Sequence, residues 1–201
     1  FEIERLIAEN TDIPVMHDDQ HATAIITGAA LLNAVEIQGK KLGQIKVVIA
    51  GAGASAISCA KHYILLGVKK KNITMCDSSG ILTKKRLNAG ELNEYKEYFA
   101  RDCEDGNLGD ALIDADVFLG LSKGGIVKGK MVKKMAENPI IFALANPDPE
   151  ILPAKARKAC PNAIIATGRS DFPNQVNNVL GFPYIFRGAL DVRAHDITPN
   201  M

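Results

Sequence analysis

Short apolar runs alternate along the chain with segments whose apolar positions recur at helical spacing. The β-branched runs predict strands at residues 45–50, 73–76, 116–119, 139–144 and 163–166. The segments between them predict helices at residues 55–66, 91–101, 129–136 and 153–159. Strands that are apolar throughout, each followed by a helix, are typical of a parallel sheet covered on both faces. The pattern therefore predicts an α/β fold, a Rossmann-like doubly wound parallel sheet with flanking helices.

Three further helices are expected outside this alternation, at residues 2–9, 21–37 and 174–194. The first has Ile3, Leu6 and Ile7 on one face. The second is apolar nearly all round, so we expect it to be buried. The third contains Gly181 and Pro183 and is predicted to bend or break there. The order of the strands beyond the first two does not follow from the sequence.

A glycine-rich turn follows the first predicted strand and opens the next helix. Gly51 allows a tight turn, Gly53 lets the backbone approach a pyrophosphate, and Ala56 permits close packing of helix on strand. The N–H groups at the start of that helix would face the phosphates, where the helix dipole favours negative charge. The predicted dinucleotide-binding residues of this turn are Gly51, Ala52, Gly53, Ala54, Ser55 and Ala56.

Asp77 ends the second predicted strand, where a carboxylate can accept hydrogen bonds from the adenosine ribose hydroxyls. Its charge favours NAD, because a carboxylate repels the 2′-phosphate of NADP. Small neutral residues follow it, however, and Lys84, Lys85 and Arg86 are available to bind a phosphate, although they equally suit a solvated helix start. The cofactor is therefore expected to be NAD(P), with a slight preference for NADP.

Composition and charge exclude several classes of protein. Lys and Arg total 24 against 23 Asp and Glu, a net charge of +1, which leaves no excess of basic residues to attract nucleic acid or an anionic membrane. Four cysteines, Cys59, Cys76, Cys103 and Cys160, form no closely spaced pair, and we expect them to be mostly buried thiols. The sequence shows neither a transmembrane run nor a signal-peptide pattern, so a cytoplasmic location is expected.

An acidic loop, Asp18 and Asp19 beside His17 and His21, precedes the second predicted helix. Asp19 or Thr23 would suit as a helix cap and nothing more. Alternatively, one carboxylate would offer a hard divalent cation an oxygen ligand while its neighbour orients a catalytic group. The spacing does not separate these two interpretations.

Three segments of the chain resemble malic enzymes of the bacterial type. They are residues 13–24 (IPVMHDDQHATA), 142–147 (FALANP) and 166–178 (ATGRSDFPNQVNN). The likeness covers essentially the whole chain in the right order and identifies it as similar to the C-terminal NAD(P)-binding domain. It departs from other branches of the family at His21 and Ala22, to which we assign no role.

The resemblance implies oxidative decarboxylation of malate to pyruvate and CO₂, with NAD(P) reduced and Mg²⁺ or Mn²⁺ required. In the family, the residue matching Asp19 binds the metal and lies near the cofactor, and the one matching Asp18 hydrogen-bonds the catalytic lysine. Thr23 and Ser122 would border the cofactor. Asn146 and Asn178 match asparagines that contact malate and the nicotinamide end, although from sequence alone Asn146 also suits a turn and Asn178 a helix cap.

In the family, the tyrosine acid, the lysine base and two more metal ligands lie in a preceding domain. Because the sequence begins with Phe1 rather than Met, we expect it to be a piece of a longer protein. Since the acid, the base and two metal ligands would lie in the preceding domain, we expect this piece to bind a dinucleotide but not to turn over malate by itself. Residues 1–20 would lead from the missing domain and carry the metal loop, and residues 21–201 would form the dinucleotide-binding domain. Partners are then malate, the missing domain and a possible second copy.

Two other functions fit the motifs. One is the dinucleotide domain of an amino-acid-type dehydrogenase, which would leave the acidic loop without a purpose, since those enzymes need no metal. The other is a non-catalytic module that senses a nucleotide.

Overall fold

The computed structural model describes residues 1–198, and its central feature is a six-stranded sheet of order β3-β2-β1-β4-β5-β6. The parallel strands are β1 (Val47–Ala50), β2 (Ile73–Asp77), β4 (Val117–Gly120), β5 (Ile140–Ala143) and β6 (Ile164–Thr167). The short strand β3 (Gly80–Ile81) runs antiparallel to β2 at the edge. The predicted α/β doubly wound fold is confirmed, and β3 is an addition that the pattern did not indicate.

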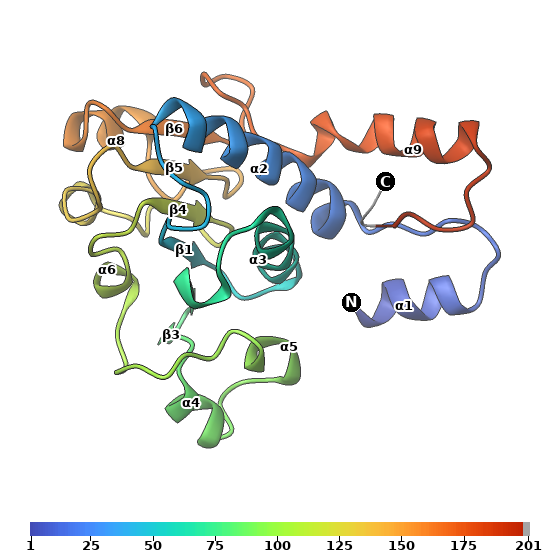
Figure 1. The fold of residues 1–201 in the computed structure, drawn as a ribbon, viewed down its shortest axis with the longest axis horizontal. Coiled ribbons are helices and arrows are strands. Elements are labelled where there is room, and N and C mark those ends of the chain that lie inside the picture. The colour runs from blue at the N-terminus through green and yellow to red at the C-terminus, as the bar shows by residue number, and fades with distance from the viewer. Residues whose placement is uncertain (199–201) are drawn as a thin grey trace.

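Helices cover both faces of the sheet (Figure 1). On one face lie α2 (Asp18–Ile37) and α3 (Ala54–Leu66), and on the other α6 (Leu108–Ala111), α7 (Gly129–Val132) and α8 (Pro153–Ala159). Successive strand residues point to opposite faces. Val47 and Ile49 therefore join the core under α2 and α3, whereas Val48 joins the core under the other helices.

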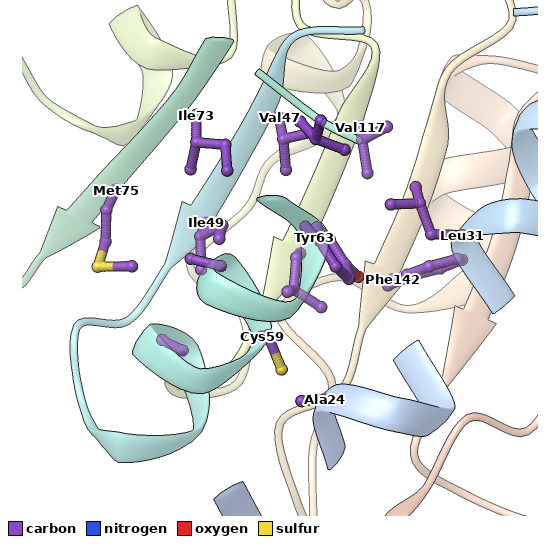
Figure 2. Close-up of a cluster of buried hydrophobic side chains, with 14 of the residues drawn as sticks. Ala24, Leu31, Val47, Ile49, Cys59, Tyr63, Ile73, Met75, Val117 and Phe142 are labelled. Atoms are coloured by element: carbon purple, nitrogen blue, oxygen red, sulfur yellow. The ribbon is translucent and has the colours of Figure 1, made fainter. Parts of the chain in front are cut away.

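The first of these cores is tightly packed (Figure 2). Tyr63 of α3 is fully buried and lies near Leu31 and Phe142, and its hydroxyl donates to the carbonyl oxygen of Thr27 at 3.4 Å. Cys59 and Cys76 are buried free thiols, as expected, but Cys103 is exposed and Cys160 half-buried. The expectation of mostly buried cysteines therefore holds for two of the four.

The predicted helix at residues 91–101 is wrong for most of its length. Only α5 (Glu94–Glu97) forms there, after α4 (Lys84–Asn88), whose start matches the helix start that the sequence allowed at Lys84. The N–H of Arg101 donates to the carbonyl of Leu82 at 2.9 Å, and the N–H of Lys84 donates to the carbonyl of Arg101 at 2.7 Å. These two backbone hydrogen bonds hold Arg101 in an extended conformation, where the local pattern favoured a helix. A 3₁₀ turn, η1 (Lys70–Asn72), leads into β2.

The terminal helices lie away from the sheet (Figure 1). Helix α1 (Glu2–Glu9) buries none of its residues, and Ile3 is 76% exposed. The predicted C-terminal helix is broken at Gly181, as expected, into a 3₁₀ turn η2 (Asn178–Leu180) and α9 (Phe182–Asp191).

Helix α2 buries mainly one side, and Ile37 at its end is 75% exposed, so the expectation of burial all round was wrong. It also begins at Asp18 rather than at His21. Within residues 1–198, no helix combines the length and apolarity needed to cross a bilayer.

Candidate functional site

The predicted site residues gather at one edge of the sheet. Gly51 follows β1, Asp77 ends β2, Ser122 lies just beyond β4, and Asn146 just beyond β5. The chain winds outward in opposite directions from the neighbouring strands β1 and β4. In open α/β sheets, ligands bind outside the carboxyl ends of the strands at such a switch point. The topology therefore places these residues around the crevice where a ligand is expected.

The glycine-rich turn has the geometry that the motif predicted. Gly51 has φ +118°, and a Cβ there would lie 2.6 Å from the carbonyl oxygen of Leu121. Its N–H donates to the carbonyl of Cys76 at 2.8 Å, which ties the turn to β2. A Cβ on Gly53 would meet nothing within 4 Å, so open space lies beside this residue. Ala56 is 1% exposed, because α3 packs closely on the sheet there.

Helix α3 offers free N–H groups to this space. It begins at Ala54 after Gly53, with no acidic side chain in its first turn. The first N–H groups of a helix have no acceptor within the helix, and the dipole makes that end positive. The half-buried residues Ala52, Ala54 and Ser55 border the same turn. The arrangement suits the phosphates of a dinucleotide.

Asp77 is held in a cluster of charges rather than left free. Its two carboxylate oxygens accept from Arg86 Nη1 and Nη2 at 3.0 and 3.1 Å, and Oδ2 also accepts from Lys96 Nζ at 3.1 Å. The N–H of Ser79 donates to Oδ1 at 2.9 Å. Although burial alone would raise the pKa of Asp77, the hydrogen bonds from Arg86, Ser79 and Lys96 hold it below its ordinary value. The carboxylate is therefore ionised and already well supplied with donors.

The neighbouring basic residues also have acidic partners. Arg86 donates through Nε to Glu91 at 2.9 Å, Lys85 pairs with Asp105 at 2.7 Å, and Lys84 lies 3.9 Å from Asp102. Thr83 caps α4 by accepting from the N–H of Arg86. Of these three cations only Arg86 contacts Asp77, where it acts together with Lys96, whereas Lys84 and Lys85 pair with other carboxylates.

Replacing Arg86 with methionine is expected to destabilise the fold by about 2 kcal/mol at pH 7, because the Asp77 carboxylate, with only 11% of its side chain exposed, loses its bidentate partner. The lowered pKa means that Asp77 adds stability above its unfolded-state pKa, and that this stability is lost as the pH falls through the lower folded-state value. The difference between wild type and variant should therefore shrink in strong acid. Urea unfolding at several pH values measures it.

The control for this experiment is Lys85→Met, which breaks the exposed pair with Asp105 and should leave stability unchanged. Equal stability of the Arg86→Met variant and wild type at pH 7 would show that Asp77 is held by other groups.

The acidic loop meets the C-terminal part of the chain. Asp18 and Asp19 lie in the first turn of α2, and the side-chain amide of Asn178 donates to Asp18 Oδ2 and, at 3.3 Å, to Asp19 Oδ1. Neither Asp19 nor Thr23 caps the helix: its N-cap is His17, without a side-chain hydrogen bond. The cap interpretation of the loop was therefore wrong. Thr23, half-buried, lies one turn beyond Asp19 on the same face.

Asp18 differs from its neighbour in burial. Its Oδ1 is buried and has no hydrogen-bond partner among residues 1–198, whereas Asp19 is exposed. Burial and the adjacent Asp19 carboxylate raise the pKa of Asp18, against the hydrogen bond from Asn178. A buried carboxylate oxygen without a donor is costly, so a cationic partner at this point would relieve the cost.

The two asparagines of the Asn177–Asn178 pair have different tasks. Asn177 caps η2 and donates through Nδ2 to the carbonyl of Gly168 at 3.0 Å, just beyond β6. Asn178 therefore does not act as the helix cap that the sequence also suggested. Its side-chain amide faces the acidic loop instead. Asn146 is exposed near Gly168, and together with Ser122 it lines a surface cavity of about 610 Å³.

Two carboxylates that the sequence did not single out support these loops. Glu4 of α1 accepts from the N–H of His17 at 3.0 Å and contacts Gln20 and His21 at 3.0 and 2.6 Å, so it holds the turn before the acidic loop. Glu150 is fully buried behind Ser122 and Asn146. Nothing in the local pattern distinguishes either glutamate from an exposed one, because both depend on contacts between distant segments.

By itself, the acidic loop could supply only part of the coordination of a metal ion. No group of three or more His, Cys, Asp or Glu side chains is placed to hold a metal ion in the part of the chain that the structure describes. Mg²⁺ requires near-octahedral oxygen coordination. The exposed carboxylate of Asp19 fits as one such ligand, and the remaining ligands would have to come from outside these residues.

The fold and the glycine-rich turn define the chain as a dinucleotide-binding domain of the Rossmann-like class. Residues 20–201 match the family model described as malic enzyme, NAD binding domain, and the chain belongs to the malic enzyme family. It is 52% identical over its whole length to an NADP-dependent malic enzyme of Halomonas elongata, and 50% identical to an NAD-dependent malic enzyme of Rhizobium meliloti. Membership of this family favours the malic enzyme hypothesis over that of an amino-acid-type dehydrogenase.

The structural comparison agrees with the sequence comparison. The crystal structure of an NAD-dependent malic enzyme from Thermotoga maritima is 45% identical, with a TM-score of 0.91 over the whole of this chain. The chain spans only part of these relatives: 47% of the Halomonas protein, 26% of the Rhizobium protein and 53% of the Thermotoga chain.

Proposed function

We propose that this chain supplies the dinucleotide site and part of the malate site of a protein that oxidatively decarboxylates malate to pyruvate and CO₂. The observation that carries the proposal is the meeting of Asp18, Asp19 and Asn178 in a chain whose sheet edge also bears the glycine-rich turn. A dinucleotide domain that only binds its ligand has no need for a carboxylate pair joined to an amide.

The residues have distinct roles in this proposal. The turn from Gly51 to Ala56 binds the pyrophosphate, and Ser122 borders the cofactor further along the edge. Asn146 hydrogen-bonds malate with its neutral amide. Asn178, whose Nδ2 donates to Asp18 and Asp19, offers its carbonyl oxygen as an acceptor to the malate hydroxyl or the nicotinamide amide. Thr23 lies near the nicotinamide. Residues 1–20 form the segment that leads from a catalytic domain into the dinucleotide-binding domain of residues 21–201.

Asp18 and Asp19 have different roles in the proposed reaction. Removing hydride from C2 of malate requires a base to take the hydroxyl proton. The unpartnered Oδ1 of Asp18 is suited to hydrogen-bond a lysine cation and orient it, which would also compensate the burial of the carboxylate. Asp19 contributes one oxygen ligand to Mg²⁺ or Mn²⁺. When bound, the cation would stabilise the negative charge that develops on the substrate oxygen as CO₂ leaves.

For the coenzyme we propose NADP over NAD, by a small margin. Each oxygen of Asp77 already accepts two hydrogen bonds, so little capacity remains for the ribose hydroxyls that a free carboxylate would bind. The charges of Arg86 and Lys96 also offset the repulsion that Asp77 would exert on a 2′-phosphate.

The test is a malate-dependent assay of the full-length protein with Mn²⁺, using NADP and NAD in turn. We expect formation of NADPH and NADH, pyruvate and CO₂, with a lower KM for NADP. Asp77→Ala should lower the KM for NADP about threefold, because Arg86 and Lys96 then become available to bind the 2′-phosphate. Asp105→Ala is the control: it breaks the bond to Lys85 but leaves Asp77 paired with Arg86, so it should not lower this KM.

Coenzyme binding without any malate-dependent reduction would contradict the proposal and favour the nucleotide-sensing module instead. A KM for NAD well below that for NADP would overturn only the proposed preference for NADP and leave the proposed reaction standing.

A further inference from the structure

Glu150 is a buried carboxylate that joins two loops of the candidate site. Its side chain is 0% exposed. Oε1 accepts a hydrogen bond from the N–H of Ser122 at 3.0 Å, and Oε2 accepts one from the N–H of Ala145 at 3.1 Å. Ser122 follows β4, and Ala145 immediately precedes Asn146 after β5. One side chain thus connects the backbone of Ser122 to that of Ala145, the residue next to Asn146, and Ser122 and Asn146 are the residues proposed to contact the coenzyme and malate.

The two loops are shaped around this carboxylate. The carbonyls of Pro149 and Glu150 accept from the N–H groups of Gly125 and Val127, both at 3.0 Å. A Cβ on Gly120 would overlap the carboxyl group of Glu150. The absence of a side chain at Gly120 therefore leaves the room that the carboxylate occupies.

Burying the Glu150 carboxylate costs desolvation free energy, so the stability of the fold does not by itself account for a charged residue at this position. Desolvation raises the pKa of Glu150, and only backbone N–H groups oppose that shift. An apolar side chain would avoid the cost of a buried charge, but it would leave the N–H groups of Ser122 and Ala145 without this acceptor. The carboxylate is suited to hold two backbone segments at a set separation.

We infer that Glu150 is a positioning residue, which sets the distance between the Ser122 loop and the Asn146 loop and thereby the fit of the coenzyme. The inference rests on the proposed function of those two loops. Glu150 itself lies behind them and does not touch the reacting groups.

The test replaces Glu150 with glutamine in the full-length protein. Glutamine has the same size, but its amide group would place a donor against one of the two N–H groups. We expect a rise of about tenfold in the KM for NAD(P), with a smaller fall in kcat, because one charge-assisted hydrogen bond is lost. Glu36→Gln is the matched control: it makes the same substitution at an exposed glutamate near the C-terminal end of α2 and should leave both constants unchanged.

A merely structural role would lower the active fraction, and hence the apparent kcat, while KM stayed at the wild-type value. That outcome would overturn the inference. Gly120→Ala displaces the carboxylate from the other side and should raise KM in the same way, so the inference stays testable if Glu150→Gln does not fold. Failure of the wild-type protein to reduce NAD(P) with malate would instead refute the proposed function.

Discussion

Asp19→Ala in the full-length protein is expected to lower malate-dependent turnover by about a thousandfold. A metal ion that stabilises developing charge contributes several kcal/mol to the transition state, and each 1.4 kcal/mol corresponds to about tenfold in rate. The exposed carboxylate of Asp19, oriented by the amide of Asn178, is the candidate ligand in the acidic loop. Steady-state assays over a range of Mn²⁺ concentrations measure the loss.

Binding of Mn²⁺, followed by electron paramagnetic resonance, gives a second readout that does not depend on turnover. The variant should bind Mn²⁺ more weakly than wild type. Asp12→Ala, which removes an exposed aspartate from the segment before the loop, should leave binding and turnover unchanged. Normal Mn²⁺-dependent activity of the Asp19→Ala variant would show that the metal is held elsewhere.

Gly51→Ala is expected to abolish useful coenzyme binding and to destabilise the fold. Alanine is strained at φ +118°, and its Cβ would lie 2.6 Å from the carbonyl oxygen of Leu121. Strain and overpacking together should lower the free energy of unfolding by about 2 to 4 kcal/mol. Displacing the turn should weaken coenzyme binding by up to about a hundredfold, because a hydrogen bond to a charged phosphate contributes about 1.5 to 3 kcal/mol. Urea unfolding and titration with NADPH fluorescence measure the two effects.

Gly53→Ala separates the effect of this turn on coenzyme binding from its effect on fold stability. Its Cβ would enter open space at an ordinary φ of −89°, so the variant should be about as stable as wild type. It should nevertheless bind coenzyme more weakly, because the methyl group occupies the space expected for the pyrophosphate. Gly188→Ala in α9, where a Cβ also meets nothing, is the control for coenzyme binding. If Gly53→Ala binds NADPH as well as wild type does, the phosphates lie elsewhere.

Much of the dinucleotide half of the site was predictable from local pattern. Gly51, Gly53 and Ala56 have roles that depend on the turn between one strand and the next helix, which a few consecutive residues determine. The sites after β4 and β5 were assigned from the resemblance, and their shared position follows from parallel strands ending at one edge. The charge network around Asp77 was only partly anticipated: Arg86 was considered as a phosphate ligand, whereas it binds Asp77 and Glu91.

Errors in the predicted elements have a common cause. The segment at residues 91–101 has a helical pattern, but Arg101 pairs with Leu82 and Lys84 across the chain. Helix α7 ends at Val132 rather than at Ala136, because the N–H of Ala136 donates to Ala115 before β4 instead of within the helix. In both places a tertiary hydrogen bond outweighs local propensity, which is worth only tenths of a kcal/mol per residue.

Local order along the chain was thus sufficient to establish the alternation of strands and helices, the fold class and the phosphate turn, since each depends on neighbouring residues and a repeating period. It could not show that Asn178 meets Asp18, that Asp77 is enclosed by Arg86 and Lys96, or that Glu150 is buried between two loops. Those contacts join residues far apart in sequence, and only the packing of the complete fold brings their polar atoms within hydrogen-bond distance.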